Sequence, residues 1–146
     1  MSISFSKLGH DVMTERSNYG APDSMKLKES IPSKDMEGRV ITIDEVIVMN
    51  KKKYDKKKKE YVKNKNGEQV YQGIAYVAFD GDKFFACKSA ILITQLEKFA
   101  GKKLIAYDEV DFDVPNIKGT KVKIVTEKIK YKDENMYDNI IFADAE

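Results

Sequence analysis

Apolar and polar residues alternate along five segments of the chain, and this period of two predicts β-strands. The expected strands cover residues 39–50, 70–80, 83–87, 119–130 and 136–142. In the first segment the alternation breaks after Asp44, which predicts a bulge or bend at that point. Asn66-Gly67 precedes the second strand and Asp80-Gly81 follows it, and both pairs are typical of tight turns. The chain therefore begins its fold as a meander of three strands.

Residues 89–100 change period and predict one α-helix. Leu92, Leu96 and Phe99 recur at the spacing of a single helical face. Ser89 is placed to cap the start, because its hydroxyl can accept a hydrogen bond from a backbone N–H of the first turn. Gly101 can adopt the left-handed conformation that ends a helix. We therefore expect a helix between the third and fourth strands.

Three meandering strands, a helix and a terminal two-stranded hairpin follow the order of elements in an OB-fold. We expect an all-β fold with one helix, built as a five-stranded Greek-key barrel of the OB type. Residues 51–65 separate the first two strands, so an extended basic loop or hairpin should project between them. Residues 1–28 lack a sustained period and are expected to form a flexible N-terminal tail, which leaves residues 29–146 as the domain.

The chain resembles the small single-stranded DNA-binding proteins of bacteriophages and of mobile elements from low-GC bacteria. The resemblance covers about residues 36–142. It rests on the start EGRVITIDEV at residues 37–46, the turn and strand DGDKFF at residues 80–85, a helix that closes in LEKF, and the terminal segments VKIV and IIF. The resemblance implies an OB-fold without enzymatic activity that binds single-stranded DNA with little sequence preference, during phage or plasmid DNA replication or recombination.

Charge is strongly segregated along the chain. Residues 51–65 hold nine lysines against Asp55 and Glu60, a local charge of +7, whereas the whole chain carries only +2. The remaining residues therefore form a body of charge −5. A basic segment on a mildly acidic body is typical of a protein whose partner is a polyanion.

The basic segment also contains two tyrosines, which lie between its lysines. An unpaired nucleic-acid strand needs cations along its phosphates and flat side chains on which its bases can stack. The segment supplies both kinds of side chain. Its candidate binding residues are Lys51, Lys53, Tyr54, Lys56, Lys57, Lys58, Lys59, Tyr61 and Lys63.

On the strands, alternation separates core aromatics from candidates for base stacking. If Ala75, Val77 and Phe79 fill the core, then Tyr76 points outward. Phe84 and the residue after it must point to opposite faces, and we choose Phe84 as the outward one. The candidates outside the basic segment are Tyr71, Tyr76, Phe84, Lys121, Lys123 and Tyr137.

Several other kinds of site find little support. One cysteine and one histidine cannot form an internal disulfide or a structural zinc site with four such ligands. Four carboxylates within residues 108–113 could hold magnesium, but they lie in one loop before a proline, so a solvated acidic loop is favoured. We expect no enzymatic activity, no catalytic residues, no cofactor and no metal.

The longest uninterrupted apolar run is six residues, 74–79, against about 20 for a membrane-spanning helix. The N-terminus lacks the apolar stretch of a secretory signal, so we expect a cytoplasmic location in a bacterial host cell, with no membrane partner. Single-stranded DNA is the expected partner. RNA as the ligand, a homodimer, and contacts with replication or recombination proteins stay open. The alternative from a different class is a protein–protein interaction module of a mobile element, in which the lysine run only aids solubility.

Overall fold

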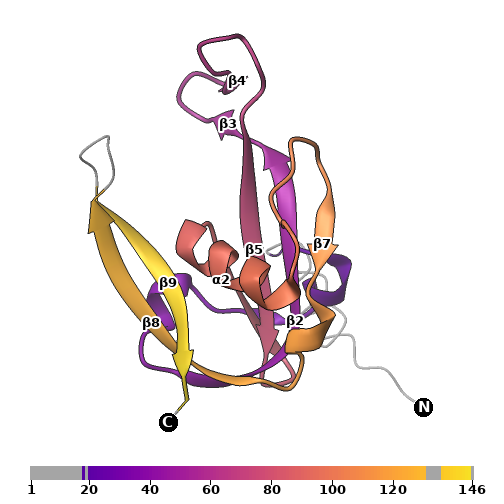
Figure 1. Cartoon of the computed structure of the whole chain (residues 1–146), viewed down its shortest axis with the longest axis vertical. Coiled ribbons are helices and arrows are strands. Elements are labelled where there is room, and N and C mark those ends of the chain that lie inside the picture. The colour runs from indigo at the N-terminus through magenta and orange to yellow at the C-terminus, as the bar shows by residue number, and fades with distance from the viewer. Residues whose placement is uncertain (1–17, 19, 131–135, 146) are drawn as a thin grey trace, which may run out of the picture.

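The computed structural model describes residues 18, 20–130 and 136–145 (Figure 1). Among these residues it contains a strongly bent seven-stranded sheet, a separate two-stranded hairpin and one α-helix. The expectation of a mostly-β fold with a single helix is therefore confirmed for the described part of the chain.

The five expected strands are present as β2 (Val40–Lys52), β5 (Tyr71–Phe79), β6 (Lys83–Cys87), β8 (Lys121–Lys130) and β9 (Met136–Asp144). The sequence did not predict two short strands, β1 (Glu29–Ser30) and β7 (Asp111–Asp113), nor the 3₁₀ turns η1 (Asp23–Met25), η2 (Ser33–Asp35) and η3 (Pro115–Ile117). The strand order is β1-β6-β5-β2-β8-β9, and β7 pairs with β2.

β2 is the strand that joins the two halves of the sheet. Its first three residues pair with β8, and the remainder pairs with β5. The register shifts between Ile43 and Glu45, which confirms the irregularity predicted near Asp44. Asp44 Oδ2 holds this bulge by accepting a hydrogen bond from the Gly81 N–H at 2.6 Å. The bulge lets one long strand bend and serve both halves.

One face of the sheet, called the inner face here, carries the main apolar core. Ala75, Val77 and Phe79 all point into this core, as alternation predicted, and Phe85 joins them. The helix α2 (Ala90–Ala100) covers the inner face with Leu92, Ile93 and Leu96. Its predicted cap at Ser89 and its left-handed end at Gly101 are both confirmed, whereas Phe99 is exposed.

The sheet is not closed, because its order ends at β1 and β9 and these strands do not pair. α2 lies along the edge of β9. There the Gln95 side chain donates to Phe142 O at 3.0 Å and accepts from the Phe142 N–H at 2.9 Å. The Ser89 hydroxyl donates to Ile140 O at 2.9 Å. Side chains of the helix thus satisfy backbone groups that a neighbouring strand would satisfy in a closed barrel.

The opposite face of β2, β5 and β6, called the outer face, is also apolar, and the segment before β2 covers it. Met25 is fully buried there, and Ala21 packs beside it. Residues 20–28 were expected in the flexible tail. They instead belong to the folded body, because the outer face of the sheet needs an apolar cover. Residues 1–17 of the expected tail lie outside the described residues.

Asn50 is a buried polar residue at the end of the core part of β2, with 1% of its surface exposed. Its Nδ2 donates to Leu104 O at 2.9 Å and to Val110 O at 3.0 Å, and its Oδ1 accepts from the Ala106 N–H at 3.0 Å. The loop between α2 and β7 is therefore fixed to β2 by one fully used amide group.

We expect Asn50→Ala to destabilise the whole fold. Each buried group left without its partner costs about 1–3 kcal/mol, so the free energy of unfolding should fall by at least about 2 kcal/mol in urea denaturation. Asn64→Ala is the matched control. Asn64 holds a turn outside the core through the N–H groups of Asn66 and Glu68, so its loss should leave global stability unchanged. Equal stability of the two variants would contradict this role of Asn50.

Candidate nucleic-acid interface

Residues 51–71 form an arm that extends beyond the main core (Figure 1). The ends of β2 and β5 form its base, and the hairpin of β3 (Tyr54–Asp55) and β4 (Glu60–Tyr61) lies farther out. A basic hairpin between the first two expected strands is therefore present, as predicted.

A four-residue turn made only of lysines, Lys56–Lys59, joins β3 to β4. The Asp55 carboxylate fixes this turn by accepting the N–H groups of Lys57 at 2.9 Å and Lys58 at 3.2 Å. Lys59 adopts a left-handed conformation with φ of 54°. That conformation costs a residue with a side chain roughly 1–2 kcal/mol, and glycine or asparagine usually occupies it. Glycine or asparagine at position 59 would make the turn more stable, yet the turn carries a fourth exposed lysine there.

Two tyrosines of the arm form an exposed aromatic pair. The rings of Tyr54 and Tyr61 lie edge to face, with centroids 5.3 Å apart and planes at 73°. They are 47% and 54% exposed, and Lys52 Nζ lies 5.9 Å from the centroid of Tyr61. Flat rings beside cationic groups are the two components that bind an unpaired strand.

Alternation along β2 and β5 shows on which face of the sheet Lys52, the cation beside the Tyr61 ring, lies. Lys52 shares the inner face with Asn50, and its neighbour across the ladder is Tyr71. Lys51 lies on the outer face, where its Nζ donates to Gly20 O at 3.1 Å. Lys51 was among the binding residues expected from the sequence, and Lys52 was not. The period of two along the strand could have corrected this choice, because of the two lysines only Lys52 lies on the same face as Tyr71.

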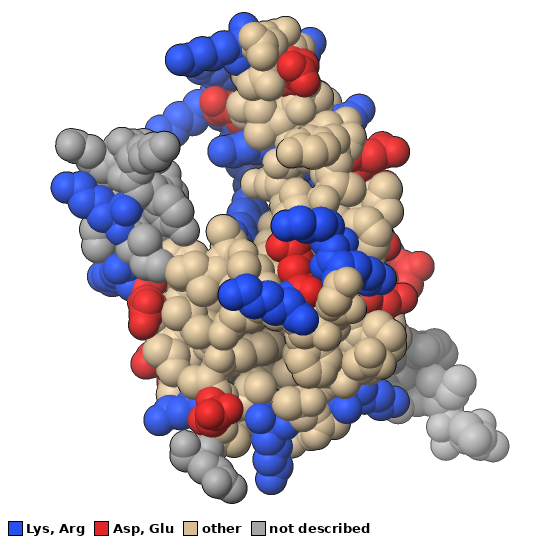
Figure 2. Space-filling view, viewed as in Figure 1, with Lys and Arg blue, Asp and Glu red and all other residues tan. Residues whose placement is uncertain are grey.

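Lysines lie both on the arm and on the β8–β9 side of the molecule (Figure 2). Lys128 and Lys130 at the end of β8 are exposed and share the inner face with Val122 and Ile124. On the arm itself, a hollow of about 540 Å³ is lined by Asp55, Lys58, Glu60, Tyr61, Val62 and Lys63.

Carboxylates gather on the other side of β2. Asp111 and Asp113 of β7 pair with Met49 and Ile47, so their side chains share the outer face with these residues. The Asp111 and Asp113 carboxylates therefore border the outer face, whereas Lys52 lies on the inner side of the arm. A polyanion is attracted to the second and repelled by the first.

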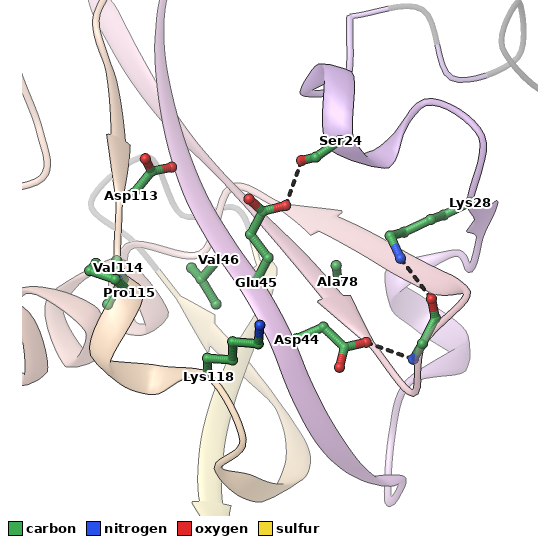
Figure 3. A pocket seen from close by; sticks show the side chains of 11 residues that line it. Ser24, Lys28, Asp44, Glu45, Val46, Ala78, Asp113, Val114, Pro115 and Lys118 are labelled. Atoms are coloured by element: carbon green, nitrogen blue, oxygen red, sulfur yellow. Dashed lines mark hydrogen bonds between the residues drawn. The ribbon is translucent and has the colours of Figure 1, made fainter.

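A hollow of about 660 Å³ lies on this acidic side (Figure 3). The Ser24 hydroxyl donates to Glu45 at 2.5 Å, and Lys28 Nζ donates to Gly81 O at 2.7 Å. Asp44 accepts the Gly81 N–H. These polar groups hold the N-terminal segment and the β2 bulge, so we assign the hollow a structural role.

Tyr76 and Phe84 do not lie on an open face, contrary to the sequence-based expectation. Alternation did turn both away from the main core, but they are 9% and 3% exposed beneath the segment that contains Met25. Their rings pack 6.4 Å apart. Burial, and then the charge of Asp111, raises the pKa of Tyr76 above its ordinary value. No pattern in the sequence indicated that this face would be covered.

The other expected site residues fall into three groups. Lys53, Lys56–Lys59 and Lys63 are exposed on the arm with its tyrosines. Lys121 and Lys123 pair with Thr42 and Val40, at the end of β2 opposite to the arm, so the structure does not bring them to the arm. The side chain of Tyr137 lies outside the described residues.

Other chemistry is limited within the described residues. Nowhere in residues 20–130 or 136–145 do three His, Cys, Asp or Glu side chains come together as metal ligands. Burial raises the pKa of the Cys87 thiol to about 11, so this thiol is protonated at neutral pH. In the same residues, no helix is long and apolar enough to cross a membrane.

Comparison of the chain with protein-family profiles, with characterised proteins and with solved structures finds no match. The function is therefore inferred from the geometry and chemistry of the arm.

We expect Tyr76→Ala to lower stability rather than affinity. Truncation of a buried large aromatic costs about 3–5 kcal/mol, so the melting temperature should fall, as it should for Phe79→Ala. Tyr76→Phe keeps the ring and should remain near wild type. A stable Tyr76→Ala variant with weakened binding to oligothymidine would show that the outer face opens and contacts the ligand.

Proposed function

We propose that the chain is a non-enzymatic protein that binds single-stranded DNA with little sequence preference, along the inner side of its arm. The observation that carries this proposal is the combination of exposed tyrosine rings with an all-lysine turn on one projecting hairpin. The strained backbone of Lys59 supports it, because a charged residue is kept there at a cost in stability.

The order of strands supports an OB-type architecture for this protein. β2 pairs with β5 on one side and with β8 on the other, β5 pairs with β6, β8 pairs with β9, and α2 lies between β6 and β8 in the chain. We therefore propose an OB-type barrel in which the last pairing, between β6 and β9, is replaced by contacts of β9 with the helix. In such barrels the loop between the first two principal strands borders the ligand, and the arm occupies that position.

A single strand suits the arm better than a duplex. Bases of every kind offer a flat face to tyrosine, which explains low sequence preference, whereas a duplex hides these faces and presents only phosphates. The lysines would follow the phosphates while the rings of Tyr54, Tyr61 and Tyr71 receive bases. Protection of unpaired DNA during phage or plasmid replication or recombination is the role that this chemistry fits.

We expect replacement of Lys56, Lys57, Lys58 and Lys59 by alanine to reduce the salt dependence of binding. Each phosphate contact on a single strand contributes about 0.7 to the slope of log affinity against log salt. The slope for oligothymidine should therefore become shallower by about 3 units at most. The matched control replaces four exposed lysines away from the arm, Lys34, Lys118, Lys121 and Lys123.

The control variant should keep the wild-type slope. An unchanged slope in the arm variant would contradict the proposal and leave the lysine run as a solvated loop. The same titration with a duplex of equal length tests stacking, since a duplex should compete more weakly than the single strand. Absence of any salt-sensitive complex would favour a protein–protein interaction module.

We expect Tyr61→Ala to weaken binding while leaving the melting temperature unchanged. Loss of one base–aromatic stack costs about 1–3 kcal/mol, and Tyr61 lies outside the main core. Tyr61→Phe keeps the ring and should bind as the wild type does. Equal affinity of the alanine and phenylalanine variants would show that the ring of Tyr61 receives no base.

A further inference from the structure

The loop between α2 and β7 presents one aromatic side chain that neither the fold nor the proposed function has used. Tyr107 is 89% exposed, the most open large apolar residue among those described. The loop around it is closely anchored. Leu104 is fully buried, the Glu97 carboxylate accepts the Leu104 N–H at 2.8 Å, and the Asn50 amide holds the residues on either side of Tyr107.

The anchors place this loop at the base of the arm, on its inner side. Ile105 lies so close to Gly73 of β5 that a Cβ at Gly73 would collide with the end of its side chain. The next residue of β5 on that face toward the arm is Tyr71, which pairs with Lys52. The loop therefore crosses the inner face one step below the Tyr71–Lys52 pair, and Tyr107 lies two residues after Ile105.

The anchors of this loop stabilise the fold through Leu104 and Asn50, whereas the ring of Tyr107 remains almost wholly in water and adds nothing to that stability. The Asn50 amide is buried and desolvated to hold the loop, which costs free energy unless all its hydrogen bonds are made. An exposed tyrosine on a fixed backbone loses little further entropy when a flat partner stacks on it. These features are typical of a preorganised contact residue.

We propose that Tyr107 is a further base-stacking residue, which receives a nucleotide of the single strand where it passes from the arm to the body. This inference rests on the proposed function, since it extends the track of Tyr54, Tyr61 and Tyr71 by one ring. It assigns a binding role to the loop between α2 and β7.

Charge around Tyr107 gives the strand an orientation. Asp108 and Glu109 follow the ring directly, and the Asp108 carboxylate accepts the Glu109 N–H at 2.8 Å. These carboxylates repel phosphate, so the base on Tyr107 must enter with its phosphates turned toward Lys52 and the arm. The acidic loop then limits how far the strand runs past the base of the arm.

Because the chain has no tryptophan, the fluorescence of a single introduced indole reports on its own position alone. In the Tyr107→Trp variant, binding of oligothymidine should quench the single indole strongly, since the base stacks on its ring. Leu27→Trp is the matched control. Leu27 is 62% exposed on the segment that covers the outer face, so its indole should not respond.

Tyr107→Ala provides the second measurement. Loss of one stack should weaken oligothymidine binding about 5- to 150-fold, with an unchanged melting temperature, because the side chain lies in solvent. An unquenched indole in Tyr107→Trp, or wild-type affinity in Tyr107→Ala, would overturn the inference.

These failures are separable from failure of the proposed function. If the wild-type chain binds oligothymidine and the four-lysine arm variant binds it less tightly, the proposed function stands whatever happens at Tyr107. If the wild-type chain forms no complex with oligothymidine, the proposed function fails, and the inference fails with it. The chain could bind DNA while the indole of Tyr107→Trp is not quenched and Tyr107→Ala binds with wild-type affinity. The inference would then be wrong, and a protein partner would be the alternative for this loop.

Discussion

Strands β2 and β5 are apolar on both faces, and the rest of the molecule is arranged around the need to cover both of them. If either face were left in water, the fold would lose about 25 cal/mol of stabilising free energy for each Å² of apolar surface exposed. The inner face is covered by α2, β8 and β9, and the outer face by the segment that contains Met25. A ligand can reach these strands only where the double cover ends, which is at the arm.

The arm is the continuation of the same two strands after their apolar positions give way to lysine and tyrosine. This change separates the molecule into a body that is stabilised by burial and an arm whose side chains remain in water. The carboxylates of Asp111 and Asp113 in β7 lie on the outer side, whereas Lys52 lies on the inner side beside Tyr71. Fold and charge therefore direct a polyanion to the same surface.

Alternation in the sequence was sufficient to predict the principal strands, the bulge near Asp44 and the faces of Ala75, Val77 and Phe79. It could not predict what covers a face, because cover depends on contacts between distant segments. Tyr76 was therefore turned correctly away from the main core but wrongly expected in solvent. Tyr107 was missed because an isolated tyrosine in an acidic loop has no period, and its support comes from Asn50, 57 positions earlier in the chain.

Ultraviolet cross-linking of the wild-type chain to oligothymidine, followed by peptide mapping, tests the central claim most directly. We expect cross-links to Tyr54, Tyr61 and Tyr71 on the arm at low salt. Unlabelled single strand should compete with the labelled strand and reduce these cross-links. Cross-links confined to Tyr76 and Phe84 would contradict the central claim, because they would mean that the segment covering the outer face leaves and that the sheet itself binds the strand.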